Sequence, residues 1–509
     1  MASIAARFWF ATTASYIHPD EHFQSLQPMT SALLQYSCPL PWEFDTIPSR
    51  SLAPLYLVYG PILSIINWFG YQVPPLTLWY IFRLILFIFN WLITDYVLYK
   101  LLPTKPERIK AVFFISTSYI TLVHQSHLFS NSLETPLVLL SLLIINDMRG
   151  CVESNTKVSA SKLITLSFIV VLGIFNRITF VAFLALPCWF VACYIWKNPL
   201  SVLVLSTSFM LFVFGFIVVD TLGYHGNFNH GWVIAPWNNL KYNSSVENLS
   251  THGLHPLYTH ILVNLPQLLG PGLVLLFTWK LSNKYWRTIP FLSIISSLVI
   301  LSTIPHQELR FLMPVLPLAA CCFDLAKFEK NPNSKNQQPS SWMATLTINS
   351  WLVFNFIMSL LMGVFHQGGV VPALDHIFQE NIHGTQIWWR TYSPPTWMLA
   401  DTNNSTQFVT INDENPTFQL SENQNIVMDT MGIEKDLLHN VIQQLGTKNL
   451  PVYLITPTAS FNTELNNTIM FEDQSFEEVW HYRYHIDMDH LDFGNIESLK
   501  PGISIYKLI

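Results

Sequence analysis

The sequence predicts an α-helical protein that crosses a membrane many times. Of its 509 residues, 50% are hydrophobic and only 11% are charged, whereas a soluble domain carries roughly 25% charged residues. Many apolar runs approach or exceed the length that crosses the ~30 Å hydrocarbon core of a bilayer. The formal net charge is −6, whereas a nucleic-acid binder shows clustered excess Lys and Arg. The composition excludes a soluble enzyme, a disordered scaffold and a nucleic-acid binder, and favours an integral membrane protein.

The apolar runs predict about eleven spans. Residues 163–196 are long enough for two spans, separated near Asn176 and Arg177. The other long runs are 76–99, 200–222, 257–279, 288–304 and 342–365, and the shorter ones are 4–17, 111–123, 133–145 and 311–325. The segment 52–70 contains Pro54 and Pro61. We interpret it as an interfacial or re-entrant piece, and we interpret the first run as an uncleaved span.

The basic residues predict the orientation, because Lys and Arg are enriched in short cytosolic loops. With the N-terminus in the cytosol, every short basic loop falls on the cytosolic side. Counting 52–70 as a span would move the later basic loops across the membrane. The residues that set this asymmetry include Arg7, Lys100, Lys105, Arg108, Arg149, Lys197, Lys280 and Lys327.

The opposite, lumenal side receives the larger polar pieces. We predict a multi-span module over residues 1–366, with lumenal loops at 18–75 and 223–256, and a small lumenal region over 367–509. A strand-like run at 451–456 indicates that this last region folds. Five potential N-glycosylation sites fall on this side, at Asn243, Asn248, Asn403, Asn404 and Asn466.

The first candidate site follows the first span and has the sequence HPDEHFQS at residues 18–25. Asp20 and Glu21 are adjacent carboxylates at a membrane boundary, where they repel each other and are costly to desolvate. Pro19 restricts His18 towards extended conformations, which helps to orient the side chains that follow. The pair suits proton transfer, but the residues alone leave an ordinary solvated loop start equally open.

Two further candidate groups lie in the lumenal loops. Trp42 and Glu43, in the sequence PWEF at 41–44, combine aromatic rings with a carboxylate, which suits a sugar. His252 and His255, in HGLHPLYTH at 252–260, can donate to sugar hydroxyls or bind a metal. The alternatives are an interfacial anchor for Trp42 and a solvated loop for the histidines.

The last group lies where one late span ends and the next begins. It contains His306, Glu308 and Arg310. Arg forms bidentate contacts with phosphate, and a lipid phosphate would lie at this depth. The alternative is a snorkelling Arg310 paired with Glu308.

Several nucleotide and hydrolase motifs are absent from the sequence. It contains no P-loop, no GxGxxG after a strand and no GxSxG. The six cysteines show neither zinc spacing nor a disulfide framework. A lipid-borne donor therefore fits better than a nucleotide or nucleotide sugar.

Taken together, these motifs resemble glycosyltransferase family 22, the multi-span mannosyltransferases of the endoplasmic reticulum that use dolichyl phosphate mannose. The resemblance rests on HPDEHFQS and on HQELRFLMPVLP at 306–317, and it runs from Phe8 to about Leu399. The family more often has Lys where this chain has Gln307. PWEF, HGLHPLYTH, HQGGVVP at 366–372 and TYSPPTWM at 391–398 are similar to the branch that adds the fourth, side-branching mannose of GPI precursors.

The resemblance implies a GT-C type fold and an α-1,2-mannosyltransferase, a hexosyltransferase of the endoplasmic reticulum membrane with a lumenal active site. A β-linked donor and an α-linked product imply one direct displacement with one general base. Asp20 is the expected base, with Glu21 as the second choice. The expected donor-phosphate residues are His306, Glu308 and Arg310, and the expected acceptor residues are His18, Trp42, Glu43, His252 and His255.

The same resemblance implies that dolichyl phosphate mannose is a co-substrate and that no cofactor is needed. No metal is expected, because the donor carries no diphosphate to neutralise. The expected partners are the lipid-linked donor and a GPI glycolipid acceptor, without nucleic acid.

Other functions stay open. A related enzyme of the family would act on another GPI mannose or on the dolichol-linked N-glycan precursor. A lipid or sugar transporter usually shows repeat-related halves, which we do not find in the sequence. A non-catalytic subunit of a membrane complex is the remaining alternative.

Overall fold

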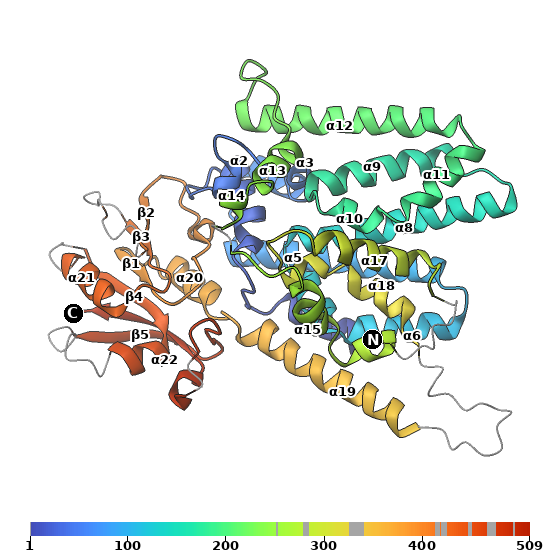
Figure 1. The fold of residues 1–509 in the computed structure, drawn as a ribbon. Coiled ribbons are helices and arrows are strands. Elements are labelled where there is room, and N and C mark those ends of the chain that lie inside the picture. The colour runs from blue at the N-terminus through green and yellow to red at the C-terminus, as the bar shows by residue number, and fades with distance from the viewer. Residues whose placement is uncertain are drawn as a thin grey trace. The chain divides into compact units, whose positions relative to one another are not determined.

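The computed structural model describes most of the chain (Figure 1). The described residues are 2–250, 253–277, 285–324, 341–412, 418, 425–445, 450–465, 475–491 and 494–509. The chain divides into two compact units. The first contains Met1–Phe8, Trp42–Val58 and Leu84–Ile357, and the second contains Trp9–Pro41, Tyr59–Arg83 and Met358–Ile509. The predicted sites at His252 and Asn466 lie outside the described residues.

The first unit is helical. α9 (Ala160–Asn176) packs against both α8 (Ser130–Ser154) and α12 (Ser201–His225), and the three helices run side by side in Figure 1. Further helices are α3 (Ala53–Val58), α6 (Lys105–Thr117), α7 (Tyr119–Leu122), α10 (Phe180–Leu184), α11 (Cys188–Lys197), α13 (Ala235–Asn243), α14 (Val246–Ser250), α17 (Ile289–Leu301) and α18 (Val315–Cys322). α1 (Ala2–Ala11) begins in this unit and ends in the second.

Four helices of the described chain are long and apolar enough to cross a membrane. They are Pro75–Leu101 (α5), Ser130–Ser154, Ser201–His225 and Ala344–Phe365, the last made of α19 (Ser341–Leu360) and a π-helical turn. These helices agree with four of the predicted apolar runs. The total of eleven spans stays a prediction.

The breaks in the shorter helices follow from local sequence. α9 ends at Asn176, where the predicted division of 163–196 lies, and a further break precedes α11. In its described part, the run 257–279 is not one regular helix, because Gly270 has φ +48°. A Cβ atom added at Gly272 would lie 2.5 Å from Trp351, so glycine allows that ring to pack closely. The segment 52–70 forms α3 and α4 (Gly60–Phe69), and neither reaches the ~20 residues of a spanning helix.

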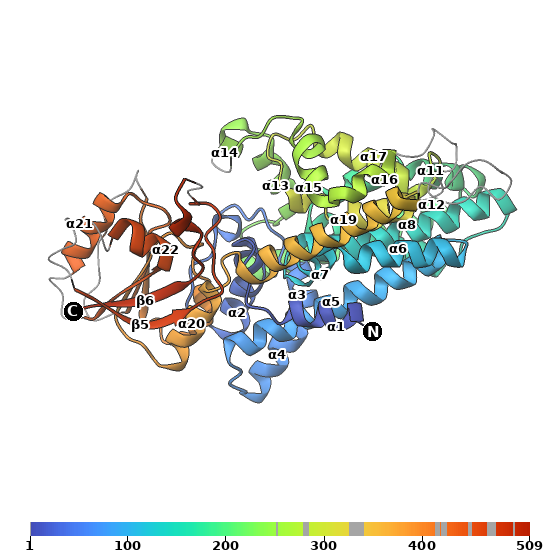
Figure 2. The ribbon, with the colours of Figure 1, turned by 90° about the horizontal axis from the view of Figure 1, so that it is seen from below.

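The second unit contains a six-stranded mixed sheet. Its strands are β1 (Thr385–Trp388), β2 (Thr406–Thr410), β3 (Asn425–Asp429), β4 (Val452–Pro457), β5 (Phe476–Tyr482) and β6 (Ile503–Leu508), in the order β2-β3-β1-β4-β6-β5. The first four strands are parallel, and β6 pairs antiparallel with β4 and β5. Figure 2 shows β5 beside β6. The strand-like run at 451–456 is β4.

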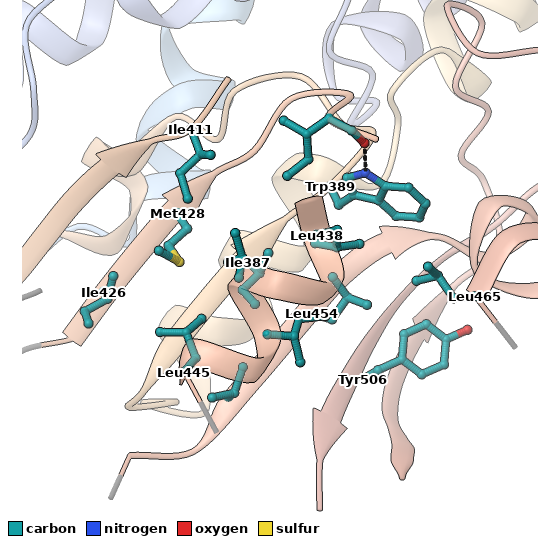
Figure 3. Packing of buried hydrophobic residues seen from close by; sticks show 14 of the residues in the cluster. Ile387, Trp389, Ile411, Ile426, Met428, Leu438, Leu445, Leu454, Leu465 and Tyr506 are labelled. Atoms are coloured by element: carbon teal, nitrogen blue, oxygen red, sulfur yellow. Dashed lines mark hydrogen bonds between the residues drawn. The ribbon is translucent and has the colours of Figure 1, made fainter. Parts of the chain in front are cut away.

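The core of the sheet lies under an amphipathic helix, α21 (Lys435–Leu445) (Figure 3). Leu438 and Leu445 of α21 belong to the same buried cluster as Ile387 of β1 and Leu454 of β4. The Trp389 indole N–H donates to the Ile433 carbonyl at 2.9 Å, which satisfies the one polar atom of this large side chain. This packing fixes the ends of β1 and β4, where the chain leaves the sheet.

Candidate active site

The predicted carboxylate pair lies in the second unit, in the first turn of a helix that continues to Leu34. The Glu21 N–H donates to the His18 carbonyl at 3.1 Å, and the His22 N–H donates to the Pro19 carbonyl at 3.0 Å. Pro is favoured at such a helix start because it has no N–H to satisfy. Acidic side chains there also interact favourably with the helix dipole.

The two carboxylates have opposite surroundings. Glu21 is completely buried, and its Oε1 lies 3.9 Å from Arg83 Nε and accepts the Trp79 indole N–H at 3.2 Å. Arg83 in turn donates to the carbonyls of Thr13 and Phe10, at 2.6 and 3.1 Å. The buried ion pair of Glu21 and Arg83 therefore connects the helix that begins at Asp20 to α5.

Asp20 is the more accessible carboxylate, with 25% of its side chain exposed. Its backbone N–H donates to His18 Nδ1 at 3.2 Å, and its Oδ1 lies 3.7 Å from the same nitrogen. The His18 Nδ1 therefore accepts, which places the proton of a neutral ring on Nε2. Asp20 can meet a substrate hydroxyl, whereas Glu21 cannot without breaking its contacts.

The motifs at 366–372 and 391–398 lie beside this helix start. Trp397 donates its indole N–H to His22 Nδ1 at 3.1 Å. The Tyr392 ring lies 6.4 Å from the His18 ring, and the Tyr392 hydroxyl lies 3.2 Å from His366 Nε2. Residues far apart in sequence thus surround the Asp20 turn.

The group around Arg310 lies in the first unit. Glu308 contacts His306 Nε2 at 2.8 Å and forms an ion pair with Arg310. His306 Nδ1 lies 3.1 Å from the Gly253 carbonyl, so both ring nitrogens meet acceptors. The hydrogen bond to Glu308 raises the pKa of His306, which favours the imidazolium form.

Gln307, between these residues, holds the surrounding backbone through hydrogen bonds. It is buried, its side-chain oxygen accepts the His260 N–H at 2.7 Å, and its amide donates to the Ser302 and Ile304 carbonyls at 3.0 Å each. Its backbone N–H donates to His255 Nδ1 at 3.3 Å. His255 thereby joins the 306–310 group, with its ring 5.9 Å from that of His306.

Arg177, which the sequence places at a polar position beside a span, belongs to the same group. Its guanidinium lies 4.7 Å from the Phe311 ring, and the Arg310 guanidinium lies 5.8 Å from that ring. Arg177 pairs with buried Glu134 at 3.7 Å. Arg50 and Arg310 both lie close enough to act on Arg177 electrostatically. Two guanidinium groups thus flank one aromatic ring.

Two other predicted acceptor residues of the first unit, Trp42 and Glu43, lie near Arg50. Glu43 pairs with Arg50 at 2.8 Å. Trp42 stacks on Tyr242 with ring centroids 4.1 Å apart, while 42% of Trp42 stays exposed. Among the predicted glycosylation sites, Asn243, Asn403 and Asn404 are exposed, whereas the Asn248 amide donates to the Tyr242 carbonyl at 3.2 Å.

Arg83 and Trp79 are the residues that sequence reasoning missed. Arg83 lies inside a predicted span, and an ionisable residue at that depth is itself a sign of a functional or paired group. Among the described residues, no group of three or more His, Cys, Asp and Glu side chains is arranged to hold a metal ion.

A family model described as the Alg9-like mannosyltransferase family matches residues 1–401. The chain belongs to this family. The family predicted from the motifs is thus confirmed, and the model ends close to the predicted limit at Leu399.

Relatives within the Alg9-like family align beyond the family model. A GPI mannosyltransferase 4 of Candida albicans is 47% identical over 100% of this chain and 98% of its own. Proteins of the same name from Debaryomyces hansenii and Saccharomyces cerevisiae are 46% and 37% identical, over 100% and 97% of this chain and 98% and 95% of their own. These alignments therefore extend through the tail after Leu399, beyond the predicted limit of the resemblance.

The fold is also found in a solved structure. ArnT from Cupriavidus metallidurans, in a crystal structure with undecaprenyl phosphate, superposes with a TM-score of 0.54 at 10% identity, covering 99% of this chain and 96% of ArnT. This likeness confirms the GT-C fold of this Alg9-like membrane protein.

Proposed function

We propose that this mannosyltransferase adds the fourth mannose of a GPI-anchor precursor in the lumen of the endoplasmic reticulum. The full-length similarity to proteins named GPI mannosyltransferase 4 carries this assignment. The donor is dolichyl phosphate mannose and the acceptor is the third mannose of the precursor. The product is an α-1,2 linkage, and no cofactor takes part.

Asp20 acts as the general base in this proposal. It takes the proton of the acceptor 2-hydroxyl as that oxygen attacks the anomeric carbon of the donor mannose. The bond from this carbon to the phosphate oxygen breaks on the opposite face, and dolichyl phosphate leaves with the electron pair. The exposure of Asp20, next to the enclosed Glu21, supports this choice.

Arg310, Arg177 and protonated His306 stabilise the phosphate as it leaves. The placement of two guanidinium groups at Phe311 supports this role, because Arg matches phosphate with two parallel N–H donors. Such fixed donors contribute several kcal/mol in a site that excludes water. Glu43 with exposed Trp42 and His255 hold the acceptor sugars, and His18 orients the Asp20 turn.

The test is a transfer assay with purified protein and labelled donor. Three acceptors are compared: GPI precursors with two and with three mannoses, and the dolichol-linked N-glycan precursor. We expect transfer only to the three-mannose GPI precursor, with loss of the product to an α-1,2-mannosidase. Transfer to either of the other two acceptors would show that the protein has the activity of a different mannosyltransferase of this family. No transfer to any acceptor would favour a transporter or an assembly subunit.

A further inference from the structure

The sheet of the second unit has a topological switch point between β1 and β4. After β1 the chain turns towards β2 on one side, and after β4 it turns towards β5 on the other. The two strands are parallel neighbours, with Trp388 opposite Ile455, so their carboxyl ends lie at the same edge. Open α/β sheets bind ligands in the crevice outside this edge at such a point.

A cavity of about 190 Å³ lies at this position. Arg390 follows β1, and Pro457 and Glu464 end and follow β4. His485 and Asp487 come from the segment after β5, and Lys500 precedes β6. The volume is below the roughly 300–1,000 Å³ of pockets for drug-sized ligands, so it suits one small polar group.

Two buried N–H donors in the lining have no acceptor among the described residues. His485 is completely buried, and its Nδ1 accepts the Gly369 N–H at 3.2 Å. Burial lowers the pKa of His485 to about 3, so the ring is neutral with its proton on Nε2. That Nε2 and the Arg390 Nε are both buried without a partner. Buried polar groups are normally hydrogen-bonded, so the residues of this lining carry more N–H donors than acceptors.

The charges of the residues that line the cavity also favour a ligand with acceptor oxygens. Arg390 pairs with Glu464, and His490 Nδ1 lies 2.6 Å from Asp487. These pairs balance the two carboxylates of the lining, which leaves the exposed Lys500 as the additional cation. The surplus is therefore one of donors and of positive charge, which disfavours an amine and favours an anionic oxygen group.

Arg390 is also held in an uncommon backbone conformation. Its φ is +55°, in the left-handed region that long side chains rarely adopt. Its N–H donates to the Met431 carbonyl at 2.5 Å, and its guanidinium lies 4.8 Å from the Trp389 ring. Such conformations persist where the surroundings impose them and cluster at ligand sites.

We propose that this cavity binds a phosphate group, either as a phosphate ester on a glycolipid or as free phosphate. Lys500 supplies the surplus charge, Arg390 offers further N–H donors beside its pair with Glu464, and His485 donates from its neutral ring to a phosphate oxygen. The site is additional to the transfer chemistry at Asp20. Its cavity is linked to that turn, because Asp487 accepts from the Gln367 amide at 3.2 Å and Gln367 accepts the Tyr392 N–H at 3.3 Å.

The test measures binding to the full-length protein in detergent by ligand-observed phosphorus NMR. The probes are inorganic phosphate and glycerol phosphate, with methyl mannoside as a phosphate-free competitor. We expect Arg390→Gln to weaken phosphate binding about tenfold or more, as for the loss of a charge-assisted hydrogen bond. Lys500→Gln, at an exposed position that does not threaten folding, should weaken it about threefold. The matched control is Arg483→Gln, an exposed residue of the same unit outside the cavity.

The outcomes separate the possibilities. Tighter binding of glycerol phosphate than of inorganic phosphate would identify an ester site, and the reverse would identify a free-phosphate site. Equal binding by wild type, Arg390→Gln and Lys500→Gln, or displacement by methyl mannoside, would overturn the proposal. Asp20→Asn and Arg310→Lys should bind phosphate at this cavity as wild type does, so failure of the transfer mechanism would leave this result intact.

Discussion

Asp20 and Glu21 show how much two adjacent residues of similar chemistry can differ. Glu21 is enclosed by Trp79 and Arg83, while Asp20 keeps an accessible carboxylate. The contacts of Glu21 hold the start of the helix in place, whereas the accessible carboxylate of Asp20 can accept a proton from a substrate.

Replacing Asp20 by Asn should lower turnover by ~10² or more, because removal of a general base acts on the transition state. The substitution keeps size and shape, so protein level and thermal stability should stay near those of wild type. The measurement is kcat in the transfer assay beside a melting curve of the same preparation. Wild-type turnover in Asp20→Asn would show that the turn is only a structural helix start.

Replacing Glu21 by Gln should act mainly on stability. Arg83 would be left buried without its countercharge, and breaking such a pair by removing one partner costs about 3–5 kcal/mol. We expect a lower melting temperature and less folded protein, with the remaining folded fraction still active. A normal melting temperature combined with a larger loss of kcat than in Asp20→Asn would make Glu21 the base.

Replacing Arg310 by Lys keeps the charge but removes the two-pronged contact, so the donor step should weaken. Arg310→Ala should weaken it further, and both changes should appear in kcat/KM for the donor more than for the acceptor. Arg149→Lys is the control, since Arg149 is half-buried, lies outside this group and pairs with Glu153 at 3.1 Å. Unchanged donor kinetics in Arg310→Ala would remove the phosphate role.

His306 predicts a pH dependence. Its pKa is raised by the hydrogen bond to Glu308, so its positive charge is complete below about 6.5, the ordinary histidine value. The charge is lost as pH rises through the raised value, and donor affinity should fall with it. His306→Gln should flatten this alkaline fall, whereas exposed His383→Gln should keep it. If donor affinity fell at high pH in His306→Gln as it does in wild type, the fall would belong to another titrating group.

At the scale of elements, long-range caps hold the short helices. Asp220, near the end of α12, accepts the Leu52 and Ala53 N–H groups at 2.8 and 2.9 Å and the Ser51 hydroxyl at 2.9 Å. These are the unsatisfied donors at the start of α3. A residue inside an apolar helix thereby fixes a segment far away in the sequence.

Asp220→Ala should therefore destabilise the protein by about 1–2 kcal/mol, in the range of a lost helix cap. Asp220→Asn should retain most of the stability, because its amide oxygen can accept the same N–H groups. Asp147→Ala, which removes an exposed pair with Lys162, is the control. Melting temperatures in one detergent provide the comparison, and equal values for Asp220→Ala and Asp147→Ala would contradict the cap.

At the scale of the whole molecule, orientation in the membrane is the first property to test. An engineered glycosylation site near Lys105 should stay unmodified, because the basic loops face the cytosol. Asn403 and Asn404 are exposed, and the double replacement by Gln should remove one glycan. The measurement is the gel shift after deglycosylation. Glycosylation near Lys105 would contradict the predicted orientation.

The sequence by itself determined the membrane class and the long helices, and it showed that Pro19 restricts the backbone of the residue before it. It also predicted the break after Asn176 and, through its motifs, the family. These follow from local properties: the hydropathy of about twenty consecutive residues, or the φ angle of one proline.

Only the tertiary structure decided which polar residues meet. Arg83 reaches Glu21 and Arg177 reaches Phe311 from distant parts of the chain, and no local pattern encodes these pairings. The strand order β2-β3-β1-β4-β6-β5 is likewise non-local, because neighbouring strands come from distant parts of the sequence. β1 itself was hard to recognise, since it has only four residues and all four are buried. A short, wholly buried strand lacks the alternation that identifies a strand in sequence. The switch point and its cavity therefore became visible only when the sheet was assembled.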